Sequence, residues 1–287
     1  MKVKKIKRKT FKIRPSGRST DFISPSFGFG CLYNCSYCYM KRHKPAGLSV
    51  ATNTEDILTE INSHAAFAQV DKPNQTHKEY ITYDISCNED FALHAKHHEW
   101  EKVFTFFKNH PNIMGSFATK YVNPNLIFFN PNGKIRIRFS LMPQSKADIH
   151  EPHTSKIIDR IKAINPFVKA GYDVHVNFSP VIVYDGWLND YYNLFQMLNN
   201  YVDLTIQANV LSEVIFLTHN ESKHLDNLKY NPVTEKDLWT PNIQETKVSQ
   251  YGGKNVRYNY KLKREYIKEF VDLHDKVIPW NKIRYIF

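Results

Sequence analysis

Three of the four cysteines of this chain lie within eight residues, at Cys31, Cys35 and Cys38. Thiols this close together make poor disulfides, because a disulfide needs a defined separation between its two Cα atoms. Their spacing is instead typical of metal ligands. Zinc would need a fourth ligand, and His43, five residues after Cys38, is a candidate for it. An iron–sulfur cluster is the alternative, and three thiolates would leave one of its irons open for another ligand.

The cysteines follow directly on a predicted strand, in a glycine-containing loop. Active sites of α/β barrels lie at this end of their strands, which favours the cluster over zinc. The spacing Cys-x₃-Cys-x₂-Cys, with Tyr37 just before the last cysteine, resembles the signature of radical S-adenosylmethionine enzymes. That resemblance implies an open iron that binds the amino and carboxylate groups of S-adenosylmethionine. An electron from the cluster then splits the sulfonium bond and produces a 5′-deoxyadenosyl radical.

The elements that must position these residues alternate between strands and helices. Apolar or β-branched runs predict strands at 21–30, 79–86, 113–122, 134–141, 172–180 and 203–208. Amphipathic stretches between most of them predict helices at 55–68, 97–109, 154–170 and 188–199. Such alternation indicates an α/β protein with a mostly parallel sheet, which right-handed crossovers curl toward a full or partial barrel.

The pattern changes from about residue 211. A helical stretch is predicted toward residue 228, followed by a β-hairpin over 249–260 around Gly252 and Gly253, a helix at 263–275 and a last strand at 282–287. We therefore expect three parts: a basic arm (1–20), a barrel (21–210), and a C-terminal region (211–287) packed on the barrel.

Composition and charge narrow the class of protein. The 287 residues are 42% hydrophobic and 14% aromatic, which is enough for a folded core. No apolar run approaches the ~18 residues of a membrane helix, and no apolar segment follows the basic N-terminus as in a secretory signal. We expect a cytoplasmic protein without a membrane partner.

The net charge is +11, and nine of the first 18 residues are Lys or Arg. Such a block attracts nucleic acid, although a solvated tail would look the same.

A wider resemblance covers nearly everything from residue 24 to 287. The stretches "GFGCLYNCSYCYM", "ISCNED", "FATKYV", "KIRIRFSL", "AGYDVHVNFSPVIVYDGW" and "VSQYGGKNVRYNY" occur in the order of the spore photoproduct lyase family. The resemblance implies a partial (β/α)₆ TIM-like barrel with a C-terminal extension that carries a β-hairpin. It also implies a 4Fe-4S cluster, S-adenosylmethionine, damaged duplex DNA as substrate, and a one-electron donor such as flavodoxin or ferredoxin.

The implied reaction converts 5-thyminyl-5,6-dihydrothymine in DNA to two thymines. The radical takes a hydrogen from carbon 6 of the lesion, the methylene bridge breaks, and a cysteine returns a hydrogen to the product radical. Cys87 is similar in placement to that cysteine, although a free cysteine is often just a small buried residue. Tyr37 and Tyr39 match the tyrosines beside the cluster, with Tyr39 favoured for radical return and Tyr37 for packing at the adenine side. Either ring could instead only exclude water.

Three further residues end predicted strands on the same rim, namely Lys120, Ser140 and Ser179. An amine and two hydroxyls there could bind the methionyl carboxylate and the ribose, or could be a solvated terminus and two strand caps. In the predicted hairpin, Tyr251 resembles a lesion-contacting tyrosine, and Lys254 and Arg257 could hold a distorted duplex. A plain edge hairpin would use the same residues.

Other features are less specific to the family. His94, His97 and His98 are expected at a solvated helix start rather than in a metal patch. "CNED" after the candidate donor and Gln250 beside Tyr251 depart from the family pattern, and only about 30 residues precede Cys31. Two alternatives therefore stay open: a radical enzyme of the same fold with another nucleic-acid or protein substrate, and a zinc-stabilised nucleic-acid-binding protein.

Overall fold

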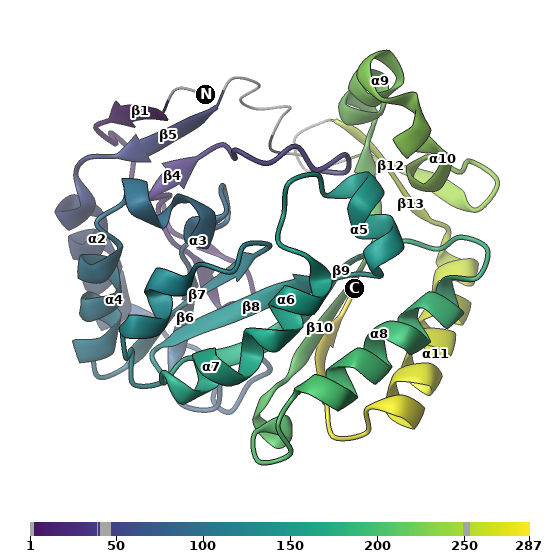
Figure 1. Cartoon of the computed structure of the whole chain (residues 1–287). Helices are drawn as coiled ribbons and strands as arrows, with labels where there is room; N and C mark the ends of the chain where they lie inside the picture. The colour runs from purple at the N-terminus through teal and green to yellow at the C-terminus, as the bar shows by residue number, and fades with distance from the viewer. Residues whose placement is uncertain (1–2, 39, 41–46, 249–252) are drawn as a thin grey trace.

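Six strands, arranged in the order of the chain, form a curled parallel sheet in the computed structural model, which describes residues 3–38, 40, 47–248 and 253–287 (Figure 1). These strands are β3 (Phe22–Ile23), β6 (Ile81–Asp84), β7 (Ile113–Thr119), β8 (Ile135–Leu141), β9 (Asp173–Val181) and β10 (Ser212–Phe216). β14 (Ile283–Ile286) extends the sheet in parallel beside β10, and β2 (Arg14–Pro15) pairs antiparallel with β3 at the other edge.

Helices cover the outer face of this sheet (Figure 1). They are α2 (Thr54–Phe67), α3 (Phe91–His94), α4 (Trp100–Asn109), α6 (Ile157–Lys162), α7 (Ile164–Lys169), α8 (Trp187–Tyr201) and α11 (Tyr260–Val277), while α5 (Gln144–His150) lies at the end of the sheet toward α9 and α10. α4 packs on β7 and β8, α6 on β8 and α7 on β9, while α8 and α11 pack on each other. The predicted α/β class and partial (β/α)₆ barrel are confirmed.

The alternation of β8 shows how the sheet separates its two faces. Ile135, Ile137 and Phe139 join the apolar core, whereas Arg136 and Arg138 point to the opposite face, because successive side chains of a strand alternate. All seven residues of this strand are buried, so the charged side chains need partners inside the barrel. The interior is therefore polar, and its side chains are held in place by ion pairs.

Glu213 on β10 is the centre of these pairs. Its fully buried carboxylate contacts Arg138 Nη1 at 3.4 Å, Arg284 Nη2, and the Ser19 hydroxyl at 2.5 Å. Arg138 also binds Asp84 at 2.9 Å. Burial acts to raise the pKa of Glu213, but the two arginines outweigh it and lower the pKa to about 2. These contacts connect four strands of the sheet to the N-terminal segment.

Two small sheets flank the barrel. One has the order β1 (Val3–Ile6), β5 (Leu48–Ala51), β4 (Gly28–Phe29), and the other β11 (Thr218–Asn220), β13 (Lys254–Tyr258), β12 (Gln244–Val248). β12 and β13 are antiparallel, as the predicted hairpin requires, and the turn between them lies outside the described residues. α9 (Glu221–Tyr230) and α10 (Glu235–Leu238) complete the C-terminal part. Short 3₁₀ turns lie at Ala95–His97, Pro124–Phe128, Gln207–Asn209 and Pro232–Thr234.

Two predicted elements were wrong. Residues 203–208 form no strand, and their Leu204 is 84% exposed; the strand comes later, at β10. The helix predicted from residue 211 begins only at Glu221, because β10 and β11 precede it. β10 is buried on both faces with Glu213 paired inside, so it lacks the alternation that identifies a half-buried strand.

Among the described residues, no helix combines the length and apolar character that crossing a bilayer requires.

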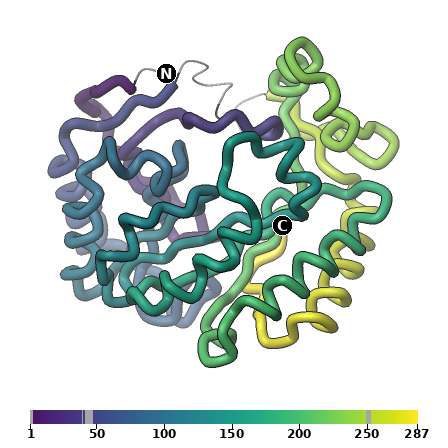
Figure 2. Tube along the Cα trace, in the orientation of Figure 1, coloured from purple at the N-terminus to yellow at the C-terminus, as the bar shows by residue number. Residues whose placement is uncertain are grey.

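The N-terminal and C-terminal segments both contribute to the sheets. Residues of the basic arm form β1 and β2, and the stretch 211–287 provides β10 and β14 of the large sheet. Figure 2 shows the end of the chain in the middle of the molecule, near β9 and β10. The C-terminal stretch is therefore in part a continuation of the barrel.

We predict that Glu213→Gln lowers the free energy of unfolding by about 3–5 kcal/mol, because it removes the carboxylate paired with buried Arg284 and one of the two carboxylates paired with buried Arg138. Urea titration followed by tryptophan fluorescence measures this. Asp272→Asn is the control: it removes an exposed ion pair with Lys268 and should change stability by less than about 0.5 kcal/mol.

The stability difference between the parent and Glu213→Gln should also depend on pH. Because the pKa of Glu213 is about 2 in the folded state and about 4.3 in an unfolded chain, its contribution is complete above pH 4.3 and disappears as the pH falls toward 2. The stability difference between parent and Glu213→Gln should therefore shrink below about pH 4. Two results would contradict this account: Asp272→Asn losing as much free energy of unfolding as Glu213→Gln, or a stability difference between parent and Glu213→Gln that does not change with pH.

Candidate active site

The three clustered cysteines lie in a loop that leaves the small sheet after β4. Gly30 has a φ of +102°, and a Cβ there would meet the carbonyl oxygen of Gly47, so only glycine fits this close approach. Cys31, Cys35 and Cys38 are free thiols and line one cavity of about 290 Å³. The lining also includes Tyr37 of the same loop and three predicted residues from other parts of the chain: Cys87, Lys120 and Ser140.

The donor set fits an iron–sulfur cluster. Burial, together with nearby Asp90, raises the pKa of the Cys31 thiol to about 12, and burial raises that of Cys35 as well. A cationic metal centre is what would make such thiols ionise. Three sulfurs on one cavity wall could hold a cluster with one iron facing the remaining space. His43, the candidate fourth ligand for zinc, lies outside the described residues.

The cysteine loop has little regular structure and is fixed by hydrogen bonds to its middle. The Ser36 amide donates to the His150 carbonyl at 2.9 Å, and the Ser36 hydroxyl lies 2.8 Å from His150 Nδ1. Asn227 of α9 donates to the Ser36 carbonyl at 2.8 Å. Each polar group of Ser36 is therefore held, and two of the three contacts come from α5. Figure 2 shows the loop running from β4 across to the C-terminal part.

The histidines at 94–98 were expected at a solvated helix start, and this was wrong for two of them. The side chains of His94 and His98 are 0% and 3% exposed, and both contact the buried Glu89 carboxylate, at 3.1 and 2.8 Å. His94 Nε2 also accepts the Leu32 amide at 3.3 Å. Positions 94 and 98 are four residues apart on one face, the signal that the sequence did offer. His94 supports the cysteine loop through Leu32, and His98 shares the Glu89 carboxylate with it.

A second buried carboxylate lies beside Tyr37. Glu151 accepts the Tyr37 hydroxyl and pairs with Arg160 at 2.8 Å and Lys120 at 3.8 Å. Burial acts to lower the pKa of Lys120, but the Glu151 carboxylate outweighs it and raises the pKa, so the amine stays protonated. Burial and Glu151 raise the pKa of Tyr37, which keeps its phenol neutral. Neither Glu151 nor Arg160 was singled out from the sequence.

Asp90 fixes the end of β7, where Lys120 follows the strand. It accepts the Thr119 hydroxyl at 2.7 Å and the Lys120 amide at 2.9 Å, and it caps α3 through the Leu93 amide at 3.1 Å. The stretch "CNED" thus provides Cys87 to the cavity together with two structural carboxylates, Glu89 and Asp90. This explains why acidic residues follow Cys87.

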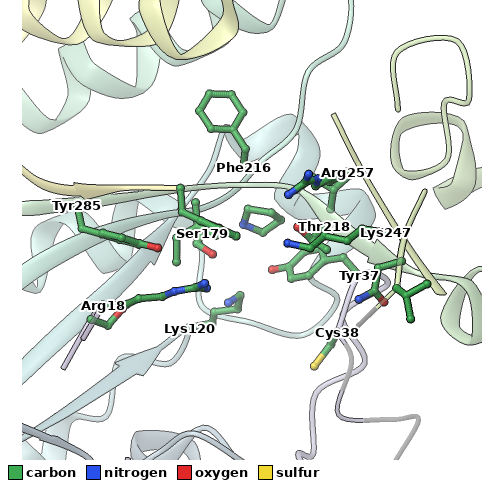
Figure 3. A pocket seen from close by; sticks show the side chains of 17 residues that line it. Arg18, Tyr37, Cys38, Lys120, Ser179, Phe216, Thr218, Lys247, Arg257 and Tyr285 are labelled. Atoms are coloured by element: carbon green, nitrogen blue, oxygen red, sulfur yellow. The ribbon is translucent and has the colours of Figure 1, made fainter. Parts of the chain in front are cut away.

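A larger cavity of about 570 Å³ adjoins the first, since Tyr37, Cys38 and Lys120 line both. Figure 3 shows Arg18 and Tyr285 on one side, Lys247 and Arg257 on the other, and Ser179 between them. Three of these side chains are cationic, and they come from the N-terminal arm and from the two hairpin strands. The cavity is therefore open to an anionic ligand large enough to span both walls.

The remaining predicted residues are placed as follows. Arg257 reaches the larger cavity and pairs with Glu245 at 2.7 Å. Lys254 does not line it; this side chain is 63% exposed at the start of β13 and lies 3.9 Å from Glu221. Tyr39 and Tyr251 lie outside the described residues.

We predict that His94→Ala destabilises the protein by about 2–4 kcal/mol and lowers the iron retained per chain after anaerobic desalting. The substitution removes the acceptor of the Leu32 amide, deprives Glu89 of one partner and leaves a cavity. His153→Ala, at an exposed histidine, is the control and should resemble the parent. Equal stability and equal iron content for His94→Ala would show that the histidine does not support the loop.

Comparisons with known proteins agree on one family. A family model described as "Spore photoproduct lyase" matches residues 3–287. The spore photoproduct lyase of Bacillus subtilis (strain 168) is 26% identical, over 97% of this chain and 80% of its own length. A solved mutant lyase with dinucleoside spore photoproduct superposes with a TM-score of 0.89 at 22% identity, covering 99% of this chain and 82% of its own. Another, with bound AdoMet and the same dinucleoside, gives 0.88 at 21% identity and the same coverage. The chain therefore belongs to the spore photoproduct lyase family of radical S-adenosylmethionine enzymes.

Proposed function

We propose that this protein reverses the spore photoproduct, 5-thyminyl-5,6-dihydrothymine, to two thymines in DNA. The observation that carries the proposal is that Cys87 lines the same cavity as the three clustered cysteines, although 49 residues or more separate them in sequence. When bound, the cluster and S-adenosylmethionine supply the radical that starts this chemistry. The similar proteins with bound AdoMet and dinucleoside spore photoproduct support this substrate and cofactor.

The chain's own residues would hold the cofactor on two sides. Cys31, Cys35 and Cys38 would bind three irons as thiolates. Lys120, kept protonated by Glu151, offers an ammonium group suited to the methionyl carboxylate, and Ser140 offers a hydroxyl from the same wall. Tyr37 bonds to Glu151 and packs beside this amine, with its ring 5.8 Å from Lys120 Nζ. The ring would exclude water from the cofactor side of the cavity.

Cys87 would return a hydrogen atom to the thymine radical that remains when the methylene bridge breaks. An S–H bond is weak enough to be donated to a carbon radical, whereas a hydroxyl is not readily used in this way. The balance is simple: one hydrogen atom leaves sulfur, one C–H bond forms, and a thiyl radical remains on Cys87. Tyr39, adjacent to the last cluster cysteine, is the proposed next residue in returning that radical to the cofactor.

The larger cavity would take the lesion and its flanking phosphates. Arg18, Lys247 and Arg257 supply positive charge on opposite walls, and Tyr285 supplies an aromatic face (Figure 3). Ser179 lines this larger cavity, and the smaller cavity with the cysteines does not include it among its lining residues. Lys254, exposed at the start of β13, and Tyr251, a DNA contact that rests on the sequence alone, are proposed as further DNA-binding residues. We also propose a cytoplasmic location and a small reducing protein, such as flavodoxin or ferredoxin, as the electron donor.

The test is product analysis on an oligonucleotide that contains the lesion, under anaerobic conditions with S-adenosylmethionine and dithionite. We expect two thymines to appear only when both are present. Cofactor cleavage without lesion reversal would contradict the proposal and point to another nucleic-acid or protein substrate. Absence of iron and of cofactor cleavage would favour the zinc-stabilised binder.

We predict that Cys87→Ala and Cys87→Ser retain at least about half of the parent's cofactor cleavage but lose at least about tenfold in thymine formation. Neither variant has an S–H bond, and serine keeps nearly the same volume, so the pair separates hydrogen donation from packing. Chromatography of the products should show adducts or abortive 5′-deoxyadenosine in place of repaired DNA. Clean repair at the parent rate would exclude Cys87 as the donor.

We predict that Arg257→Ala weakens binding of lesion DNA by roughly tenfold and makes the slope of log affinity against log salt shallower by about one. Fluorescence anisotropy at several salt concentrations measures both quantities. The matched control is Lys102→Ala on α4, which also carries an acid-paired cation but lies on the helical face. If both variants bind as the parent does, Arg257 makes no phosphate contact.

A further inference from the structure

The segment 218–238, which contains β11, α9 and α10, has an unusual interior. Its buried residues are His219, Asn220, Lys223, Asn227, Thr234, Glu235 and Leu238, so only one member of this fully described segment's interior is apolar. Its large apolar side chains point outward instead: Leu225 is 60% exposed, Leu228 47%, Tyr230 76% and Val233 61%. Apolar burial therefore contributes little to its stability, and small units of this kind are commonly held by a metal or a disulfide.

The polar interior converges on one point. His219 Nε2 lies 3.2 Å from both carboxylate oxygens of Glu235, and His224 Nδ1 lies 2.5 Å from Glu235 Oε2. The three ligand atoms all lie within 4.8 Å of one another. The side chains are well shielded from solvent, with 0%, 15% and 5% exposure for His219, His224 and Glu235. They come from three different elements: the strand β11, the helix α9 and the start of α10.

Imidazole nitrogens and a carboxylate are a common ligand set for zinc. Zinc bonds of about 2.0–2.2 Å in a tetrahedron place ligand atoms roughly 3.3 Å apart. The 3.2 Å separations between His219 Nε2 and the Glu235 oxygens match this value, whereas the 2.5 Å between His224 Nδ1 and Glu235 Oε2 is a hydrogen bond that would lengthen when an ion is bound. We propose that His219, His224 and Glu235 bind one zinc ion, with water in the fourth position. The ion would replace the missing apolar core of residues 218–238. This site shares no ligand with the cysteine cluster, and its argument does not rest on the proposed repair reaction.

The zinc site would also support the cysteine loop. Asn227 donates one hydrogen bond to Glu235 and another to the Ser36 carbonyl, between Cys35 and Cys38. Fixing Glu235 on a metal therefore fixes Asn227 and, through it, the middle of the loop. The hydrogen-bonded cluster without a metal is the competing account, in which both imidazoles simply donate to Glu235.

The experiment uses the full-length protein, purified anaerobically with its cluster, incubated with zinc chloride and desalted. Zinc and iron per chain are counted by mass spectrometry, and X-ray absorption at the zinc edge identifies the ligands. We expect about one zinc per chain with nitrogen and oxygen ligands only. His224→Ala and Glu235→Gln should lower zinc affinity by at least about tenfold, measured against a chelator. Asp226→Asn, an exposed carboxylate on α9 between the ligands, should retain the parent's zinc.

Three results would overturn the proposal: parent protein that retains no zinc, zinc bound by sulfur, or ligand variants that retain as much zinc as Asp226→Asn. The parent's zinc content and absorption spectrum decide the matter even if a ligand variant fails to fold. Iron content and lesion repair are measured on the same samples, so failure of the repair proposal would be seen separately.

Discussion

Three sulfurs must face one point from a loop that has almost no regular secondary structure. Within the loop the Cys38 amide donates to the Cys35 carbonyl, and other hydrogen bonds of the loop go to side chains and a carbonyl of distant elements. His150 and Asn227 hold Ser36, and His94 holds the amide next to Cys31. The cysteine geometry is therefore a property of the folded barrel and its C-terminal part, not of the motif alone.

The polar interior of the barrel follows from the same requirement. A wall that must present an ammonium group, hydroxyls and thiols cannot be apolar, and each buried charge there needs a partner. Glu213 and Glu151 each pair with two cations; Glu213 lies on β10, next to the edge strand β14, and Glu151 lies beside the cofactor space. The outward faces of the same strands form the apolar core. An alternating sequence such as "IRIRFSL" therefore supplies apolar side chains to the core and polar side chains to the cavity.

The sequence allowed much of this to be predicted, but not all. Features that depend on a short stretch of sequence could be predicted. They are the cysteine spacing, the strands β6 to β9 and the strand-end positions of Lys120 and Ser140. Glu151 and Tyr37 are 114 residues apart, and Asn227 and Ser36 are 191 apart, so no spacing reveals those contacts. β10 was missed because a strand buried on both faces with a paired glutamate lacks the usual alternation, and His94 because its partner is a buried carboxylate.

The most direct measurement is electron–nuclear double resonance on the reduced, oxygen-protected protein with ¹⁵N- and ¹⁷O-labelled S-adenosylmethionine. If three cysteines hold the cluster and leave one iron accessible, hyperfine coupling to the labelled amino nitrogen and carboxylate oxygen will appear, and it will persist in the Cys87→Ala variant. A cluster without such coupling, a fourth protein sulfur on the metal, or a protein without iron would contradict the account at its foundation.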